Sequence, residues 1–257
     1  MCGIVGAVAK RNVVDILVEG LRRLEYRGYD SCGFALLAER GLERARTTAR
    51  VSDLADQGKQ MSGNLGIAHT RWATHGKPDT VNAHPHFSGD LIGVVHNGII
   101  ENYEEERERL KKLGYEFESQ TDTEVIAHLI HYFVKHKNKT LLEATQMLGE
   151  ELRGAFAIAV ISLKNPDEMI CARLGCPLII GLGDTQNFIA SDISALLAVT
   201  KKVIYLEDGD VVKIKKDSIQ IFDKDKKAIT RKTHISDVTL SSMELGPYDH
   251  FMQKEIY

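Results

Sequence analysis

The feature that most restricts the fold of this chain is a series of short, strongly apolar runs, each bounded by charged or turn-forming residues. Such runs are too short for buried helices and favour buried strands. Strands are predicted at 2–9 (CGIVGAVA), 31–38 (SCGFALLA), 64–69, 91–97 (LIGVVHN), 155–162 (AFAIAVIS), 168–173, 178–183 and 187–191. The last four follow one another closely, which favours an antiparallel meander.

Helices are predicted where apolar residues recur every three or four positions. These segments are 13–28, 101–114, 121–136, 140–152 and a short helix at 192–199. Gly28 would cap the first at its C-terminus, and Thr121 or Asp122 would cap the third at its N-terminus. Residues 203–223 read as one hairpin with an Asp208-Gly209 turn. Because helices and strands occur in blocks, the pattern indicates a layered α+β domain up to about Asp223, followed by an extension at 224–257.

Composition and charge exclude several classes of function. The 257 residues are 43% hydrophobic and carry a net charge of −3 without a Lys/Arg block, which argues against nucleic-acid binding. No apolar run reaches the roughly 18 residues of a membrane span, and no basic segment precedes the N-terminal apolar run as in a secretory signal. The cysteines show no disulfide or metal spacing, so we expect reduced thiols in a cytoplasmic protein, with Cys32, Cys171 and Cys176 as small core residues.

Cys2 is the first candidate for chemistry. Removal of Met1 is expected because the side chain at position 2 is small, and it leaves Cys2 with a free α-amine. The thiol has a reference pKa of about 8.5 and the amine one of about 7.7–8.0, so both can act near neutral pH. One residue then offers a nucleophile together with its own base. The alternative is that Cys2 merely begins a buried strand.

Three further polar positions fit the hydrolysis of an amide. Asn97 and Gly98 adjoin the end of an apolar strand, where a side-chain NH₂ and a backbone N–H could stabilise an oxyanion. Arg71 could bind a carboxylate and Asp122 an ammonium group. Together they describe a site for a zwitterionic amino acid with a side-chain amide. Taken singly, each has an ordinary structural explanation, namely a turn, a surface cation and a helix cap.

A histidine cluster suggests different chemistry. His69, His75, His84, His86 and His96 lie within one short stretch of the chain. Such a cluster could bind zinc in a domain without catalytic activity. No H-E-x-x-H motif or paired cysteine spacing supports that alternative, and it remains open at this point.

Several motifs together resemble one enzyme family. They are CGIVG, YRGYDS, HTRWATHG, VNAHPH, HNGIIEN, TDTEVIAHL, RGAFAI, PLIIGLG and FIASD. The chain resembles the glutaminase domains of the glucosamine-6-phosphate synthase family over essentially its whole length. Other class II glutamine amidotransferases share the Cys-Gly-Ile start and the Asn-Gly pair but differ at YRGYDS and HTRWATHG. The resemblance implies the N-terminal nucleophile hydrolase fold, a four-layer αββα sandwich of two antiparallel sheets.

The resemblance also implies a role for each matching residue. Cys2 attacks the glutamine amide while its α-amine moves the proton, and Asn97 and Gly98 form the oxyanion hole. Arg71 binds the substrate carboxylate, and Asp122 together with the Gly98 carbonyl binds the substrate ammonium.

The remaining implied roles concern the surroundings of the substrate. The segment 71–80 is expected to close over glutamine, with Trp72 helping to gate ammonia. Thr74 and His75 would line the pocket, and Arg27, Gly28 and His84 would support it.

The implied organisation is a glutamine amidotransferase domain at 1–240, with 241–257 as the start of a linker to an absent sugar-isomerase region. L-glutamine would be hydrolysed to glutamate and ammonia through a γ-glutamyl thioester. Fructose 6-phosphate would be used only through the absent region, giving glucosamine 6-phosphate in a homodimeric full-length enzyme. No metal or organic cofactor, nucleic acid or membrane is expected. The alternative within enzymes is another class II amidotransferase with a different acceptor.

Overall fold

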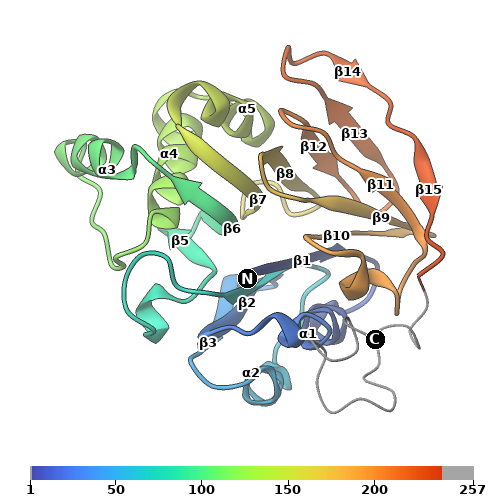
Figure 1. The fold of residues 1–257 in the computed structure, drawn as a ribbon. Coiled ribbons are helices and arrows are strands. Elements are labelled where there is room, and N and C mark those ends of the chain that lie inside the picture. The colour runs from blue at the N-terminus through green and yellow to red at the C-terminus, as the bar shows by residue number, and fades with distance from the viewer. Residues whose placement is uncertain (1, 239–257) are drawn as a thin grey trace, which may run out of the picture.

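Two antiparallel β-sheets lie face to face between two helical layers in the computed structural model, which describes residues 2–238 (Figure 1). The eight-stranded sheet has the order β15 (Thr233–Ile235), β11 (Lys202–Tyr205), β9 (Ile179–Gly183), β10 (Gln186–Ala190), β1 (Gly3–Val8), β4 (Leu65–Arg71), β2 (Ser31–Ala38) and β3 (Gly41–Thr47). The seven-stranded sheet has the order β14 (Ala228–Ile229), β13 (Ile219–Phe222), β12 (Val211–Ile214), β8 (Met169–Leu174), β7 (Gly154–Ser162), β6 (Ile92–Ile100) and β5 (His86–Ser88).

Helices cover the outer face of each sheet. The helices α1 (Val14–Arg22) and α2 (Val51–Gly58) pack on the eight-stranded sheet, and the helices α4 (Thr123–His136) and α5 (Leu141–Glu151) pack on the seven-stranded sheet. The helix α3 (Tyr103–Lys112) packs beside α4. Within residues 2–238, three short 3₁₀ helices lie in connections: η1 (Glu25–Arg27), η2 (Thr80–Asn82) and η3 (Ile193–Leu196).

Three clusters of buried apolar side chains correspond to the three interfaces between these layers. Two lie between a sheet and its helices, and the third lies between the sheets. Strand β1 contributes to two of them because successive side chains point to opposite faces. Ile4 belongs to the cluster between the sheets, whereas Val5 belongs to the cluster under α1. The expected α+β, four-layer αββα sandwich is therefore confirmed.

The predicted strands and long helices are present, but two pairings predicted from the sequence are wrong. The four runs from 155 to 191 do not form one meander, since β7 and β8 pair in one sheet and β9 and β10 pair in the other. Residues 203–223 are not one hairpin either. Strand β11 pairs with β9 and β15, whereas β12 pairs with β8 and β13, so Asp208-Gly209 lies on a crossing between the sheets.

Several other elements differ from the sequence predictions. The 13–28 helix ends at Arg22, and Gly28 terminates η1 instead. The pattern missed β3 and α2, whose apolar residues are interrupted by charges, and the short strand β5. The expected extension contains β14 and β15, which add to the two sheets. The domain boundary at 240 and the linker at 241–257 lie outside the described residues, so both stay predictions.

No helix in the part of the chain that the structure describes is long and apolar enough to cross a membrane.

Candidate active site

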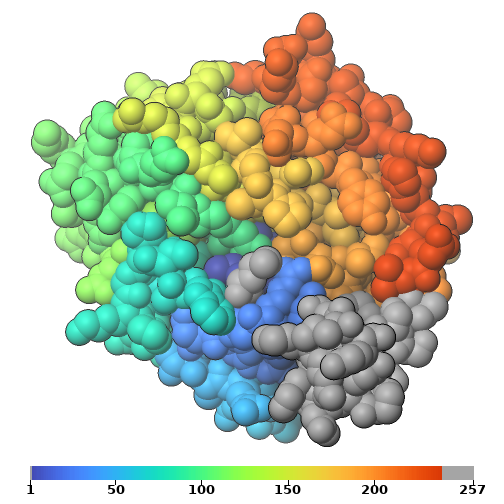
Figure 2. Space-filling view, in the orientation of Figure 1, coloured from blue at the N-terminus to red at the C-terminus, as the bar shows by residue number. Residues whose placement is uncertain are grey.

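The polar residues predicted from the sequence come together where the inner faces of the two sheets meet. Register places Gly3 of β1 beside Thr70 of β4, which brings Cys2 next to the end of β4. Ile67 and Val95 both belong to the cluster between the sheets. Two residues further on, the side chains of His69 and Asn97 therefore face the same interior from opposite sheets. Figure 2 shows the blue N-terminal residues at the bottom of a depression beside the cyan segment that follows β4.

A cavity of about 520 Å³ opens beside Cys2. It is lined by six of the predicted residues: Cys2, Arg27, Trp72, Thr74, Asn97 and Gly98. Ile99, Glu101, Cys176 and Ser191 also line it, although no sequence pattern singled them out. A second cavity, of about 200 Å³ between α5 and β12, is lined by ion-paired side chains such as Lys226 and Glu150, and no cysteine or serine lines it.

The thiol of Cys2 is held by the backbone of Trp72, the residue that follows β4. Its Sγ accepts a hydrogen bond from the Trp72 N–H at 3.1 Å and lies 3.5 Å from the Trp72 carbonyl oxygen. Burial raises the pKa of this thiol above its usual value, and the Trp72 N–H opposes that rise only in part. The thiol is therefore protonated at neutral pH, and it needs a base before it can attack a carbonyl carbon.

Asn97 lies beside the thiol within β6, which continues to Ile100, so the predicted position at a strand end is wrong. Its Nδ2 donates to the Cys2 carbonyl at 3.3 Å, and its Oδ1 lies 2.9 Å from His69 Nε2. Gly98 follows with φ +131°, and a Cβ there would lie 2.0 Å from the Ala155 carbonyl oxygen. Only glycine fits this close approach. The strand thus presents an amide NH₂ at the cavity.

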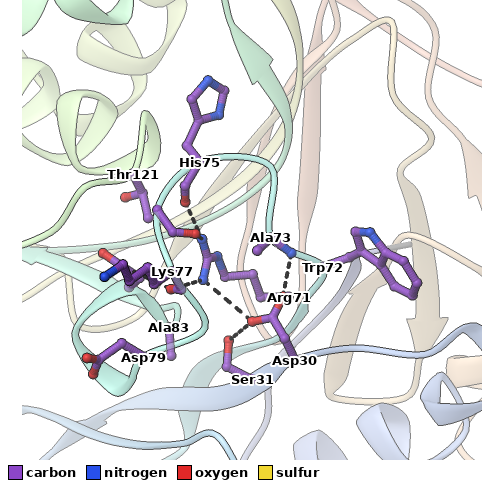
Figure 3. A network of polar contacts seen from close by, with 12 residues as sticks. Asp30, Ser31, Arg71, Trp72, Ala73, His75, Lys77, Asp79, Ala83 and Thr121 are labelled. Atoms are coloured by element: carbon purple, nitrogen blue, oxygen red, sulfur yellow. Dashed lines mark hydrogen bonds and ion pairs between the residues drawn. The ribbon is translucent and has the colours of Figure 1, made fainter.

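The guanidinium of Arg71 does not line the cavity. Figure 3 shows it enclosed by the segment that follows it, while the Trp72 side chain points the other way. Its terminal nitrogens donate to the carbonyls of residues 75–77, with the Lys77 oxygen at 3.2 Å and the Gly76 oxygen at 3.3 Å, and pair with Asp30 at 3.5 Å. Only 3% of the side chain is exposed. In this conformation Arg71 fixes the 75–77 segment, and its role as a carboxylate ligand stays a prediction.

Asp122 occupies the position before α4 but does not cap the helix with its side chain. Its Oδ2 accepts from the Ile100 N–H at 2.9 Å, which ties the start of α4 to β6. Its Oδ1 lies 3.9 Å from His75 Nδ1, and Thr74 Oγ1 lies 3.2 Å from the same nitrogen. The other oxygen of Asp122 is therefore directed towards the 74–75 segment, so the predicted helix cap is replaced by a contact with the site.

The residues expected to support the site are in contact with it. Gly28 has φ +73°, and a Cβ there would lie 3.0 Å from Trp72 Cζ3, so glycine leaves room for the indole. Arg27 forms an ion pair with Asp192. His84 stacks on His69 with ring centroids 4.1 Å apart.

Two residues at the site, Asp30 and Cys176, differ from what the sequence predicts. Asp30 accepts from the Ala73 N–H and the Ser31 hydroxyl besides pairing with Arg71, so it fixes the exit from β4 (Figure 3). Its only signal was its place in the YRGYDS motif. Cys176 was predicted to be a core residue, but it is half-buried and lines the cavity, whereas Cys32 and Cys171 are buried as predicted. All four cysteines are free thiols, as expected.

The histidine cluster has no geometry for zinc. Four of its members are buried, and burial is the main reason that their pKa values are lowered, to about 3 for His69 and His86. His69 and His84 stack ring on ring instead of directing nitrogens to a common point. Within residues 2–238, no group of three or more His, Cys, Asp or Glu side chains could hold a metal ion.

Comparison with solved structures agrees with this architecture. Glutamine phosphoribosylpyrophosphate amidotransferase from B. subtilis superposes with a TM-score of 0.74 at 24% identity, covering 88% of this chain and 50% of that one. A structure described as the allosteric regulatory enzyme of purine biosynthesis gives the same TM-score at 27% identity, covering 87% of this chain and 49% of that one. The fold is thus the N-terminal nucleophile hydrolase fold of class II amidotransferases.

Comparison of sequences identifies the family. The chain is 55% identical to a glutamine–fructose-6-phosphate aminotransferase (isomerizing) of Xylella fastidiosa and 54% identical to one of Neisseria meningitidis. Both alignments cover all of this chain but only 42% and 43% of those proteins. A family model described as "Glutamine amidotransferase domain" matches residues 70–198, half of the chain. The chain therefore belongs to the glutamine amidotransferase domain family.

Proposed function

We propose that this chain hydrolyses L-glutamine to glutamate and ammonia through a γ-glutamyl thioester on Cys2. The observation that carries the proposal is the pairing of a thiol and an amide NH₂ in one cavity. Asn97 Nδ2 lies 3.3 Å from the carbonyl oxygen of Cys2, so this hydrogen bond holds the oxyanion donor beside the residue that carries the nucleophile.

The reaction follows from these groups. The thiol proton passes to the Cys2 α-amine, which exists only after Met1 is removed, and the thiolate attacks the side-chain amide carbon of glutamine. The Asn97 NH₂ and the Gly98 N–H stabilise the oxyanion. When the tetrahedral intermediate collapses, the α-ammonium group of Cys2 returns the proton to the leaving nitrogen, and ammonia departs. A water molecule then cleaves the thioester and releases glutamate with the free thiol.

Two charged residues beside the cavity, Asp122 and Arg71, are proposed to bind the α-ammonium and α-carboxylate of glutamine. Asp122 and the Gly98 carbonyl bind the ammonium, Arg71 binds the carboxylate, and Thr74 and His75 complete the wall. Because the terminal N–H groups of Arg71 are directed to the 75–77 carbonyls and Asp30, binding a carboxylate requires this segment to shift. Substrate binding and movement of the 71–80 segment are therefore coupled.

The acceptor of the ammonia is proposed from the relatives' names alone. In a longer protein the ammonia would convert fructose 6-phosphate to glucosamine 6-phosphate in a sugar-isomerase region joined through 241–257. That protein would be a homodimer in the cytoplasm. Trp72, which lines the cavity and is 55% exposed, would gate the path of ammonia.

The proposal is tested by measuring glutamate release from glutamine, with the intact mass recorded to show that Met1 is absent. The wild-type chain is expected to be active and Cys2→Ala to be inactive. Cys32→Ala removes a thiol that lies outside the cavity and serves as the matched control, with unchanged activity expected. Arg71→Ala is expected to raise KM more than it lowers kcat. Equal activity of Cys2→Ala and the wild type would contradict the thioester mechanism.

A further inference from the structure

His69 is a buried histidine that the proposed reaction does not use. It lies on β4 with no exposed surface, and its Nε2 is 2.9 Å from Asn97 Oδ1. The two side chains come from different sheets, so this hydrogen bond crosses the interior of the sandwich next to the nucleophile. Such a contact can set the geometry of Asn97 without touching the substrate.

The orientation of the Asn97 amide decides whether it can stabilise an oxyanion. The two ends of a carboxamide have nearly the same shape, but only the NH₂ end donates hydrogen bonds. The Cys2 carbonyl is an acceptor and selects the NH₂ end on its side. The oxygen end then faces His69, which must donate from Nε2. The two contacts together leave the second N–H of Asn97 available to the cavity.

The surroundings of His69 keep its ring neutral and fixed. Burial lowers the pKa of His69 to about 3, although the contact with Asn97 opposes this shift, so the ring carries one N–H at neutral pH. His84 stacks on the ring at 4.1 Å between centroids. His84 is itself fixed, because its Nε2 lies 2.8 Å from Thr123 Oγ1. A neutral ring held in one plane can donate in one direction only.

We propose that His69 is a positioning residue for glutamine hydrolysis: its Nε2–H holds Asn97 Oδ1 and thereby turns the Asn97 NH₂ towards the oxyanion. The inference rests on the proposed function only where activity is the readout. The tautomer and the orientation of the amide are properties of the protein itself.

The first test is a pair of variants of similar shape, His69→Gln, which can still donate to Asn97, and His69→Met, which cannot. Loss of one oxyanion donor costs about 10²–10³ in kcat. We expect His69→Met to lower kcat by about 10–100-fold, which is less than the full loss because a misaligned donor retains part of its effect. KM should stay within about threefold of wild type. His69→Gln should recover most of that loss. Equal losses in the two variants, or a loss confined to KM, would overturn the proposal.

A double-mutant cycle separates positioning from general damage to the fold. In an Asn97→Ala background, His69→Met is expected to lower kcat by less than about threefold, because the group on which it acts is gone. Alkylation of Cys2 by iodoacetamide, followed on the Cys2 peptide by mass spectrometry, should proceed at the wild-type rate in His69→Met. Multiplicative losses of kcat in the cycle would show that His69 acts independently of Asn97.

The ring tautomer gives a readout that does not need activity. Nitrogen-15 NMR of the wild-type chain is expected to show His69 protonated at Nε2 and unprotonated at Nδ1 at pH 7. Protonation at Nδ1 would exclude donation to Asn97 and would refute the positioning role even in an active enzyme. If the chain releases no glutamate, the proposed function fails, and the tautomer still decides the inference.

Discussion

At the scale of single residues, Gly28 shows how one backbone conformation serves the site. Its φ of +73° and ψ of 148° lie in a region that is almost restricted to glycine, and a Cβ would meet the Trp72 ring at 3.0 Å. Gly28→Ala is therefore expected to lower the free energy of unfolding by about 1–3 kcal/mol and to reduce glutamine kcat/KM by displacing Trp72. Urea titration and glutamate release measure the two effects.

The matched control for this substitution is Gly149→Ala. Gly149 lies in α5, and a Cβ there would have no atom within 4 Å. Alanine is preferred over glycine in a helix by roughly 0.5–1 kcal/mol, so this variant should be more stable than wild type with unchanged activity. Destabilisation of both variants to the same extent would mean that contact with Trp72 and backbone strain do not matter at Gly28.

At the scale of elements, the start of α5 is fixed by a capping box. Thr140 Oγ1 accepts from the Glu143 N–H at 3.2 Å, and the Glu143 carboxylate accepts from the Thr140 N–H at 2.8 Å. Thr140→Ala is expected to lower the free energy of unfolding by about 1 kcal/mol, while Thr140→Ser, which keeps the hydroxyl, should be close to wild type. Thermal and urea unfolding test this. A Ser variant as unstable as the Ala variant would argue against the cap.

At the scale of the whole molecule, buried histidines make stability depend on pH. Burial lowers the pKa of His69 and His86 to about 3, and partial burial together with nearby cations such as Lys135 lowers the pKa of the half-buried His131 to about 4. Between the ordinary histidine pKa of about 6.5 and these values, the unfolded chain binds protons that the folded chain does not. Stability therefore rises with pH in this window and is lost as pH falls, by up to about 1.4 kcal/mol per pH unit for each fully buried histidine and by less for His131, which solvent screens.

Urea titrations at pH 7, 6 and 5 measure this slope. His131→Gln should reduce the slope between pH 6 and 5, because one proton fewer is taken up on unfolding. A stability that is flat from pH 7 to pH 5 would show that the buried rings are protonated in the folded protein.

The amino-acid pattern alone predicts the local elements and half of the residues that line the cavity. The apolar runs that became β1, β2 and β6 are recognisable because burial on both faces requires almost continuous apolar residues. The helix at 121–136 is recognisable from its periodicity. Cys2, Asn97 and Gly98 could be chosen because amide hydrolysis requires a nucleophile and oxyanion donors, and the structure places all three at one cavity.

The pairing of the strands and the directions of the polar groups depend on the assembled fold. No local sequence pattern predicts that β8 and β9 belong to different sheets, because strand pairing depends on contacts between residues far apart in the chain. The same long-range packing encloses Arg71 among the carbonyls of residues 75–77 and brings His69 of one sheet to Asn97 of the other. Periodicity reports which face of an element is buried, whereas the partner across the interface is fixed by the assembled fold.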